Sequence, residues 1–185
     1  KLKPHGVDFT RAPQDGEGPL PAVFMSAVSE KLSASAGENS TTFVLRSGWN
    51  INTNQGIGTE FEKKGWASLL AQEKQLAAKP VGERQGLYKP YVERGVDAKG
   101  RAVVNVMTAD LASAESCVNC HNPLEATPDV IAMRGKAPMK QFALGDLMGA
   151  VSTTVPIANS EAIVKELAAA QASVGSQFRW FAIVG

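Results

Sequence analysis

The stretch LYKPYVERGVDAKGRAVVNVM, residues 87–107, has the pattern of a β-hairpin. Apolar residues gather towards its two ends, and residues 97–100 (DAKG) have the composition of a turn. We therefore expect two strands, at residues 87–92 and 102–107. Pro90 has no amide hydrogen to donate, so the first strand is expected at an edge of its sheet or at a bulge.

Two further segments are typical of strands. Residues 42–46 (TFVLR) form a short apolar run, and residues 150–155 (AVSTTV) are rich in β-branched side chains and are closed by Pro156. Strand and helix patterns therefore alternate along the chain.

Two helices are expected ahead of the hairpin. The first begins at Pro21 and stops at Gly37, and its apolar face comprises Val23, Phe24, Val28 and Leu32. The second begins at Thr59, which forms a capping-box pattern with Glu62, and stops at Pro80.

The two ends of the chain are expected to lie outside the packed domain. Residues 1–18 are rich in Pro, Gly and charge and predict an exposed arm, followed by one domain at residues 19–158. Residues 159–185 predict a long C-terminal helix with one apolar stripe, made of Ile163, Leu167, Ala170, Val174 and Phe178. Its ending FRWFAIV (178–184) is typical of a helix that enters a membrane interface, and docking on its own domain is the alternative.

Length and charge narrow the class of protein. A chain of 185 residues suits one compact domain with small appendages. Its 19 basic and 18 acidic residues nearly cancel and are scattered, so nucleic acid is not an expected partner. The chain starts with Lys1 rather than Met, and we expect that a leader has been removed.

The motif CVNCH at residues 117–121 carries the chemistry. This spacing lets two thiols reach the vinyl groups of one porphyrin, while the adjacent histidine binds the iron. It predicts one covalent haem c, attached through Cys117 and Cys120, with His121 as the proximal ligand. Because such attachment takes place outside the cytoplasm, we expect a periplasmic or other extracytoplasmic location.

Other chemistries for the two cysteines are a structural zinc site and a redox-active dithiol. A closed zinc site needs four ligands and would have to recruit the distant His5 besides His121. A thioredoxin-like dithiol would need a βαβ context that the chain lacks.

Several segments together resemble a known family. Residues 117–121, the stretch GDLMGAVS at 145–152 and Pro156-Ile157 are similar to the monohaem c-type, PAS-like sensor domains. Arg46-Ser47 with the Asn-rich loop behind it, and Phe61-Glu62, match the family more loosely. The resemblance covers about residues 19–157.

The resemblance implies an α+β fold, in which a PAS-like antiparallel sheet is flanked by helices and one haem is held against it. Domains of this family commonly stand outside the membrane at the front of histidine kinases and chemoreceptors, and some stand alone. Some members present a cysteine from the first helix as the second axial ligand of the iron. This chain has no third cysteine, and counting back from Arg46 places Met25 at or beside that position.

Met25 is therefore the candidate sixth ligand of the iron. A thioether would raise the haem potential relative to a thiolate. A core methionine is the alternative reading, and an open sixth position would favour gas binding. Other candidate donors are Met107, Met133, Met139, Met148 and His5.

Two arginines and one asparagine are candidates for further contacts with the haem. The guanidinium groups of Arg46 and Arg134 can pair with propionate carboxylates. Asn52, in the loop behind Arg46, is a further cofactor-binding candidate, with turn formation as the alternative.

We expect from these observations an extracytoplasmic haem domain that senses redox state or a small diatomic ligand and moves its C-terminal helix. A monohaem electron carrier, free or in a redox complex, is the alternative. No enzyme is expected, because neither paired carboxylates nor a Ser-His-Asp order can be found. The expected partners are a redox protein or a diatomic ligand, a membrane at the C-terminal helix, and a second copy in a homodimer.

Overall fold

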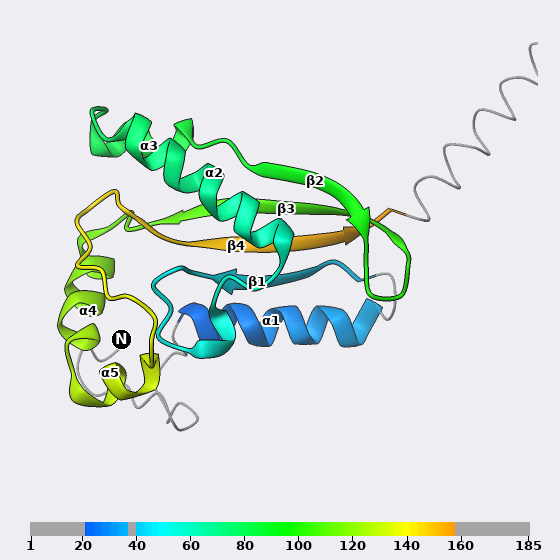
Figure 1. The fold of residues 1–185 in the computed structure, drawn as a ribbon, viewed down its shortest axis with the longest axis horizontal. Coiled ribbons are helices and arrows are strands. Elements are labelled where there is room, and N and C mark those ends of the chain that lie inside the picture. The colour runs from blue at the N-terminus through cyan, green and yellow to red at the C-terminus, as the bar shows by residue number, and fades with distance from the viewer. Residues whose placement is uncertain (1–20, 37–39, 158–185) are drawn as a thin grey trace, which may run out of the picture.

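The computed structural model describes residues 21–36 and 40–157 (Figure 1). The elements follow in the order α1 (Pro21–Ala36), β1 (Thr42–Arg46), the 3₁₀ helix η2 (Thr53–Gln55), α2 (Glu60–Leu76), α3 (Val81–Leu87), β2 (Tyr91–Val96), β3 (Ala102–Leu111), α4 (Glu115–Glu125), α5 (Pro128–Arg134) and β4 (Leu147–Pro156). The strands at 42–46 and 150–155 and both early helices are confirmed.

The four strands form one antiparallel sheet in the order β1-β4-β3-β2. β4 is the last strand in the sequence but lies between β1 and β3. One row across the sheet consists of Val44, Ser152, Met107 and Tyr91. The predicted α+β class, an antiparallel sheet flanked by helices, is confirmed for the described part of the chain, and the arrangement is consistent with a PAS-like fold.

The hairpin is confirmed with a shift of its first strand. β2 begins at Tyr91, directly after Pro90, rather than at residue 87. The turn explains the shift. Asp97 Oδ1 accepts hydrogen bonds from the backbone N–H groups of Lys99 and Arg101. Strand pairing therefore begins directly beside the turn, with Val96 opposite Ala102, and runs outward to Tyr91 opposite Met107. β2 is an edge strand, as Pro90 predicts.

Helix α2 crosses one face of the sheet and closes the core (Figure 1). The buried core cluster comprises Leu69, Met107, Leu111, Leu147 and Ala150. Gly65 allows the close approach, because a Cβ atom there would lie 2.6 Å from Met107 Sδ. The predicted capping box is present: Thr59 Oγ1 accepts from the Glu62 N–H, and Glu62 Oε2 accepts from the Thr59 N–H.

Helix α1 packs mainly on the edge strand β1. The Ser29 hydroxyl oxygen accepts a hydrogen bond from the backbone N–H of Phe43 on that strand, at 3.1 Å. Two residues of the predicted apolar face of α1 are exposed, Phe24 at 53% and Leu32 at 47%, whereas Val28 is half-buried.

The predicted N-terminal arm at 1–18 and C-terminal helix at 159–185 lie outside the described residues, so the expected membrane entry and dimerisation of the C-terminal helix stay predictions. Among the helices of the described chain, none combines the length and apolar character that a membrane span requires.

Candidate haem-binding site

The CVNCH motif lies on helix α4, at the end of the sheet where α5 also packs (Figure 1). Cys117, Cys120 and His121 are spaced i, i+3 and i+4, which places their side chains on one face of the helix. Both cysteines are free thiols, Cys117 half-buried and Cys120 exposed. The helix therefore presents two reactive sulfur atoms and one imidazole in the same direction.

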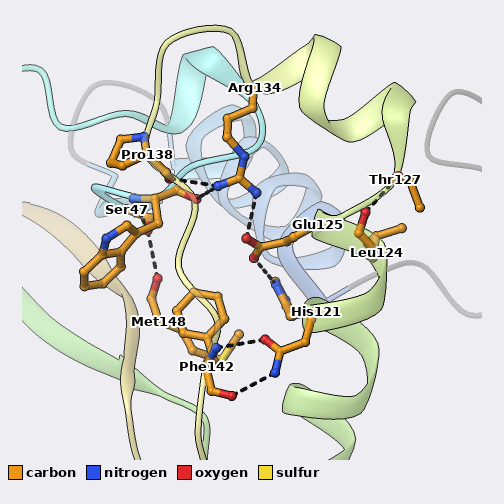
Figure 2. Close-up of polar contacts among 11 residues, drawn as sticks. Ser47, His121, Leu124, Glu125, Thr127, Arg134, Pro138, Phe142 and Met148 are labelled. Atoms are coloured by element: carbon orange, nitrogen blue, oxygen red, sulfur yellow. Dashed lines mark hydrogen bonds and ion pairs between the residues drawn. The ribbon is translucent and has the colours of Figure 1, made fainter.

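The imidazole of His121 is oriented from within its own helix. Its Nδ1 atom lies 3.2 Å from Glu125 Oε1, one helical turn further on (Figure 2). A carboxylate can only accept, so in a neutral ring the proton belongs on Nδ1 and the lone pair on Nε2. This is the tautomer that an Nε2 metal ligand requires.

Glu125 is itself held by a buried ion pair with Arg134 of α5. The Arg134 Nη2 atom donates to Glu125 Oε2 at 2.6 Å, and the two residues are 4% and 1% exposed. Arg134 Nη1 also donates to the backbone oxygens of Pro138 and Trp49, at 2.9 and 3.3 Å. The guanidinium thus ties α5, the loop behind it and the loop after β1 to α4.

An aromatic ring stands beside His121. The Phe142 ring meets the imidazole edge to face, with 5.9 Å between centroids and 89° between planes. Asn122, the next residue on α4, donates to the Phe142 carbonyl and accepts from its N–H. Trp49 also packs edge to face with Phe142, with 6.1 Å between ring centroids, and the Lys140 ammonium lies 4.2 Å from the centre of the Trp49 ring.

A second carboxyl lies within electrostatic reach of His121. Asp110 stands near the end of β3, where the register shifts. Desolvation by the surrounding protein atoms raises the pKa of its carboxyl, and His121 opposes that rise.

The donor set fits a haem c. The two thiols and the imidazole share one face, the His121 side chain remains 41% exposed, and its Nε2 atom is left available. A structural zinc site was the alternative. The described part of the chain holds no group of three or more His, Cys, Asp or Glu side chains placed to bind a metal ion. His5 lies outside the described residues.

Met25 is half-buried on α1, whose first turns lie towards the end of the molecule that carries α4 and α5 (Figure 1). Among the other candidate donors, Met107 is fully buried in the core cluster. Met133 and Met139 are exposed. Met148 is half-buried, and its carbonyl accepts from the Ser47 hydroxyl at 2.8 Å.

Arg46 and Asn52 belong to a different part of the structure. Arg46 Nε donates to Glu62 Oε1 and its Nη1 donates to the Asn54 carbonyl, both at 2.6 Å. Asn52 is exposed and caps η2, since its side chain accepts from the Asn54 N–H. Within the described residues, these contacts stay among β1, η2 and α2 and do not reach α4.

The sequence analysis did not identify three residues that surround or orient His121. Glu125 could have been found from its i+4 spacing to His121, had the helix been extended past the motif. Arg134 was considered for propionates, whereas three of its contacts are made with Glu125, Trp49 and Pro138. Phe142 comes from a loop distant in sequence, so no local signal identifies it.

Comparison with known proteins identifies the family of the chain. No curated protein matches it. A solved structure, described as the cyanobacterial haem protein Tll0287, is similar with a TM-score of 0.49 and 14% identity, over 75% of this chain and 73% of that one. A family model described as Tll0287-like: Tll0287 matches residues 3–156. With most of its length covered by that match, the chain belongs to the Tll0287-like family.

Proposed function

We propose that this chain is an extracytoplasmic haem c domain that senses the redox state of its iron or a small diatomic ligand. One observation carries the haem assignment: Cys117, Cys120 and His121 share one face of α4, and Glu125 holds Nδ1 of the imidazole. Family membership supports it, since the protein that gives the family its name is described as a haem protein.

Bound haem would supply an iron centre that exchanges one electron and can accept a sixth ligand. The thiols of Cys117 and Cys120 would fasten the porphyrin, and Nε2 of His121 would bind the iron. Glu125 keeps the imidazole in the metal-binding tautomer. Phe142, which packs edge to face with the imidazole, would help to hold the ring in place. The proposal needs no catalytic residue, so we propose a sensor rather than an enzyme.

Helix α1 is the element that we propose to respond to the iron. It carries Met25 and packs mainly on one edge strand, β1, so its displacement would act chiefly on that strand. Its exposed Phe24 and Leu32 would let it repack against another surface. Gain or loss of a Met25 bond to iron would bias the position of α1, and we propose that the segment after residue 158 passes the change on.

Electron transfer is the second candidate function, and the exposure of the attachment site favours it. Cys120 is exposed and the His121 side chain is 41% exposed, so a porphyrin bound there would have an edge near the surface. A surface-exposed edge is what exchange of electrons with a partner protein requires. A carrier, unlike a sensor, should keep one structure in both oxidation states.

The test begins with production of the chain behind an export signal in a bacterium that matures c-type cytochromes. We expect a red protein whose denatured chain keeps the mass of one haem. The same chain without the export signal should be colourless. The Cys117→Ala/Cys120→Ala variant is the matched control and should lose the covalent haem. A colourless exported protein would refute the proposed function.

Hydrogen exchange then separates the sensor from the carrier. A sensor should show different amide protection of α1 in the ferric and ferrous states, or with and without carbon monoxide. Equal protection in all these states would leave electron transfer as the function. An unchanged ferrous spectrum under carbon monoxide would argue against gas sensing.

A further inference from the structure

Two buried charged side chains, Glu125 and Arg134, continue inward from the partly exposed His121. His121 Nδ1 is 3.2 Å from Glu125 Oε1, and Glu125 Oε2 is 2.6 Å from Arg134 Nη2 (Figure 2). Glu125 is 1% exposed and Arg134 is 4% exposed. The described chain contains other ion pairs, but in this one both side chains are almost completely removed from water.

Burial of two charges is costly, and a pair of well-packed apolar residues would fill the same space without that cost. The geometry shows what the pair adds. Arg134 cannot shift easily, because its Nη1 atom also donates to the carbonyls of Pro138 and Trp49. With Oε2 of Glu125 fixed by Arg134, the carboxylate has its other oxygen directed at the imidazole.

We propose that Glu125 is a positioning residue for the axial ligand and sets the reduction potential of the site, with Arg134 as its anchor. This inference rests on the proposed function, in which His121 binds haem iron. A hydrogen bond from Nδ1–H to a carboxylate makes the imidazole a stronger electron donor at Nε2. Stronger donation stabilises the ferric state and lowers the potential. Arg134 neutralises part of this charge and keeps the carboxylate in place.

A conservative substitution separates charge from shape. Glu125→Gln keeps an oxygen that can accept from Nδ1–H but removes the negative charge. We expect covalent haem as in the unmodified chain and a reduction potential shifted to more positive values. The iron–histidine stretching band, recorded by resonance Raman after photolysis of the carbon monoxide complex with every variant carried in the Met25→Ala background, should move to lower frequency.

Glu115→Gln is the matched control, because it removes one carboxylate from the exposed first turn of the same helix. It should leave both the potential and the Raman band unchanged. If Glu125→Gln fails to fold, the pair can be removed as a whole with Glu125→Met/Arg134→Leu. That double variant should fold and should also show a more positive potential.

The outcomes distinguish this inference from the proposed function. Absence of covalent haem in the unmodified chain refutes the proposed function and the inference with it. A haem-loaded Glu125→Gln or double variant whose potential and Raman band equal those of the unmodified chain refutes the inference alone. Equal shifts in Glu125→Gln and Glu115→Gln would also refute it, because the effect would then be one of overall charge.

Discussion

Asn122 binds both backbone polar groups of Phe142. Its Nδ2 atom donates to the Phe142 carbonyl at 2.9 Å, and its Oδ1 atom accepts from the Phe142 N–H at 2.8 Å. The residue that follows the imidazole on α4 thereby fixes the loop that places an aromatic ring against that imidazole. Two elements twenty residues apart in sequence are joined at one point.

Asn122→Ala should therefore loosen the loop. Both hydrogen bonds disappear and leave the Phe142 backbone groups in a partly buried place, which should lower the free energy of unfolding by about 1–3 kcal/mol. Urea unfolding measures this loss. Asn119→Ala, at an exposed position of the same helix, is the control and should have little effect. Equal stability of the two variants would show that the hydrogen bonds between Asn122 and Phe142 do not contribute to the free energy of unfolding.

Met25→Ala should open the sixth position of the iron if Met25 is its ligand. The ferrous variant should then bind carbon monoxide at once and shift its absorption bands, whereas the unmodified protein should bind it slowly or not at all. Met133→Ala, which alters an exposed methionine, serves as the control. An unchanged spectrum and carbon monoxide response in Met25→Ala would eliminate Met25 as a ligand.

The Arg46–Glu62 pair should make stability depend on pH. Burial acts to raise the pKa of Glu62, but the backbone N–H of Thr59, the Arg46 guanidinium and the backbone N–H of Gly58 outweigh it and hold the pKa below its usual 4.5. A lowered pKa in the folded state means that the stabilisation is fully present above pH 4.5 and is lost as the pH falls through the folded value.

Glu62→Gln should remove this dependence and cost about 1–3 kcal/mol at neutral pH, because a hydrogen-bonded ion pair is lost. Thermal unfolding measured from about pH 7 into acid below pH 4.5 follows both effects. Glu60→Gln on the exposed side of α2 should keep the pH dependence in that window. A Glu62→Gln protein that loses stability with acid as steeply as the unmodified one would contradict the assignment.

Gly65→Ala should push α2 away from the sheet. The added Cβ would lie 2.6 Å from Met107 Sδ and 3.2 Å from Tyr91 Cδ1. We expect a loss of about 1–3 kcal/mol in unfolding free energy from overpacking. Gly82→Ala in α3 meets no atom within 4 Å and should be neutral or stabilising by up to about 1 kcal/mol. Comparable losses in both variants would show that contact with the core is not the cause.

Local signals predicted the elements that depend on local chemistry. The capping box of Thr59 and Glu62 marks the start of α2 in both sequence and structure, because its hydrogen bonds span three residues. The strand at 42–46 was located to the residue. The first strand of the hairpin was placed too early, because pairing outward from the turn at Asp97, rather than apolar content alone, determines where β2 runs.

Contacts between segments distant in the sequence could not be predicted from the sequence pattern. Periodicity predicts an apolar face on α1 but does not say what covers it, and Phe24 and Leu32 are exposed. The partner of Arg46 is Glu62 on α2, a tertiary contact that composition does not reveal. The candidate haem-binding residues could be read from the motif at 117–121, whereas the Glu125–Arg134 pair depends on the packing of α5 against α4.

The central place of β4 has a mechanical consequence. The strand is hydrogen-bonded along both edges, to β1 and to β3, so sliding it along its axis would break two ladders at once. It therefore forms a stiff connection between the loop that precedes Leu147 and residue 157. In the proposed sensor, a signal carried by β4 would be a tilt of the whole sheet, whereas α1, which contacts mainly β1, would be the element able to move separately.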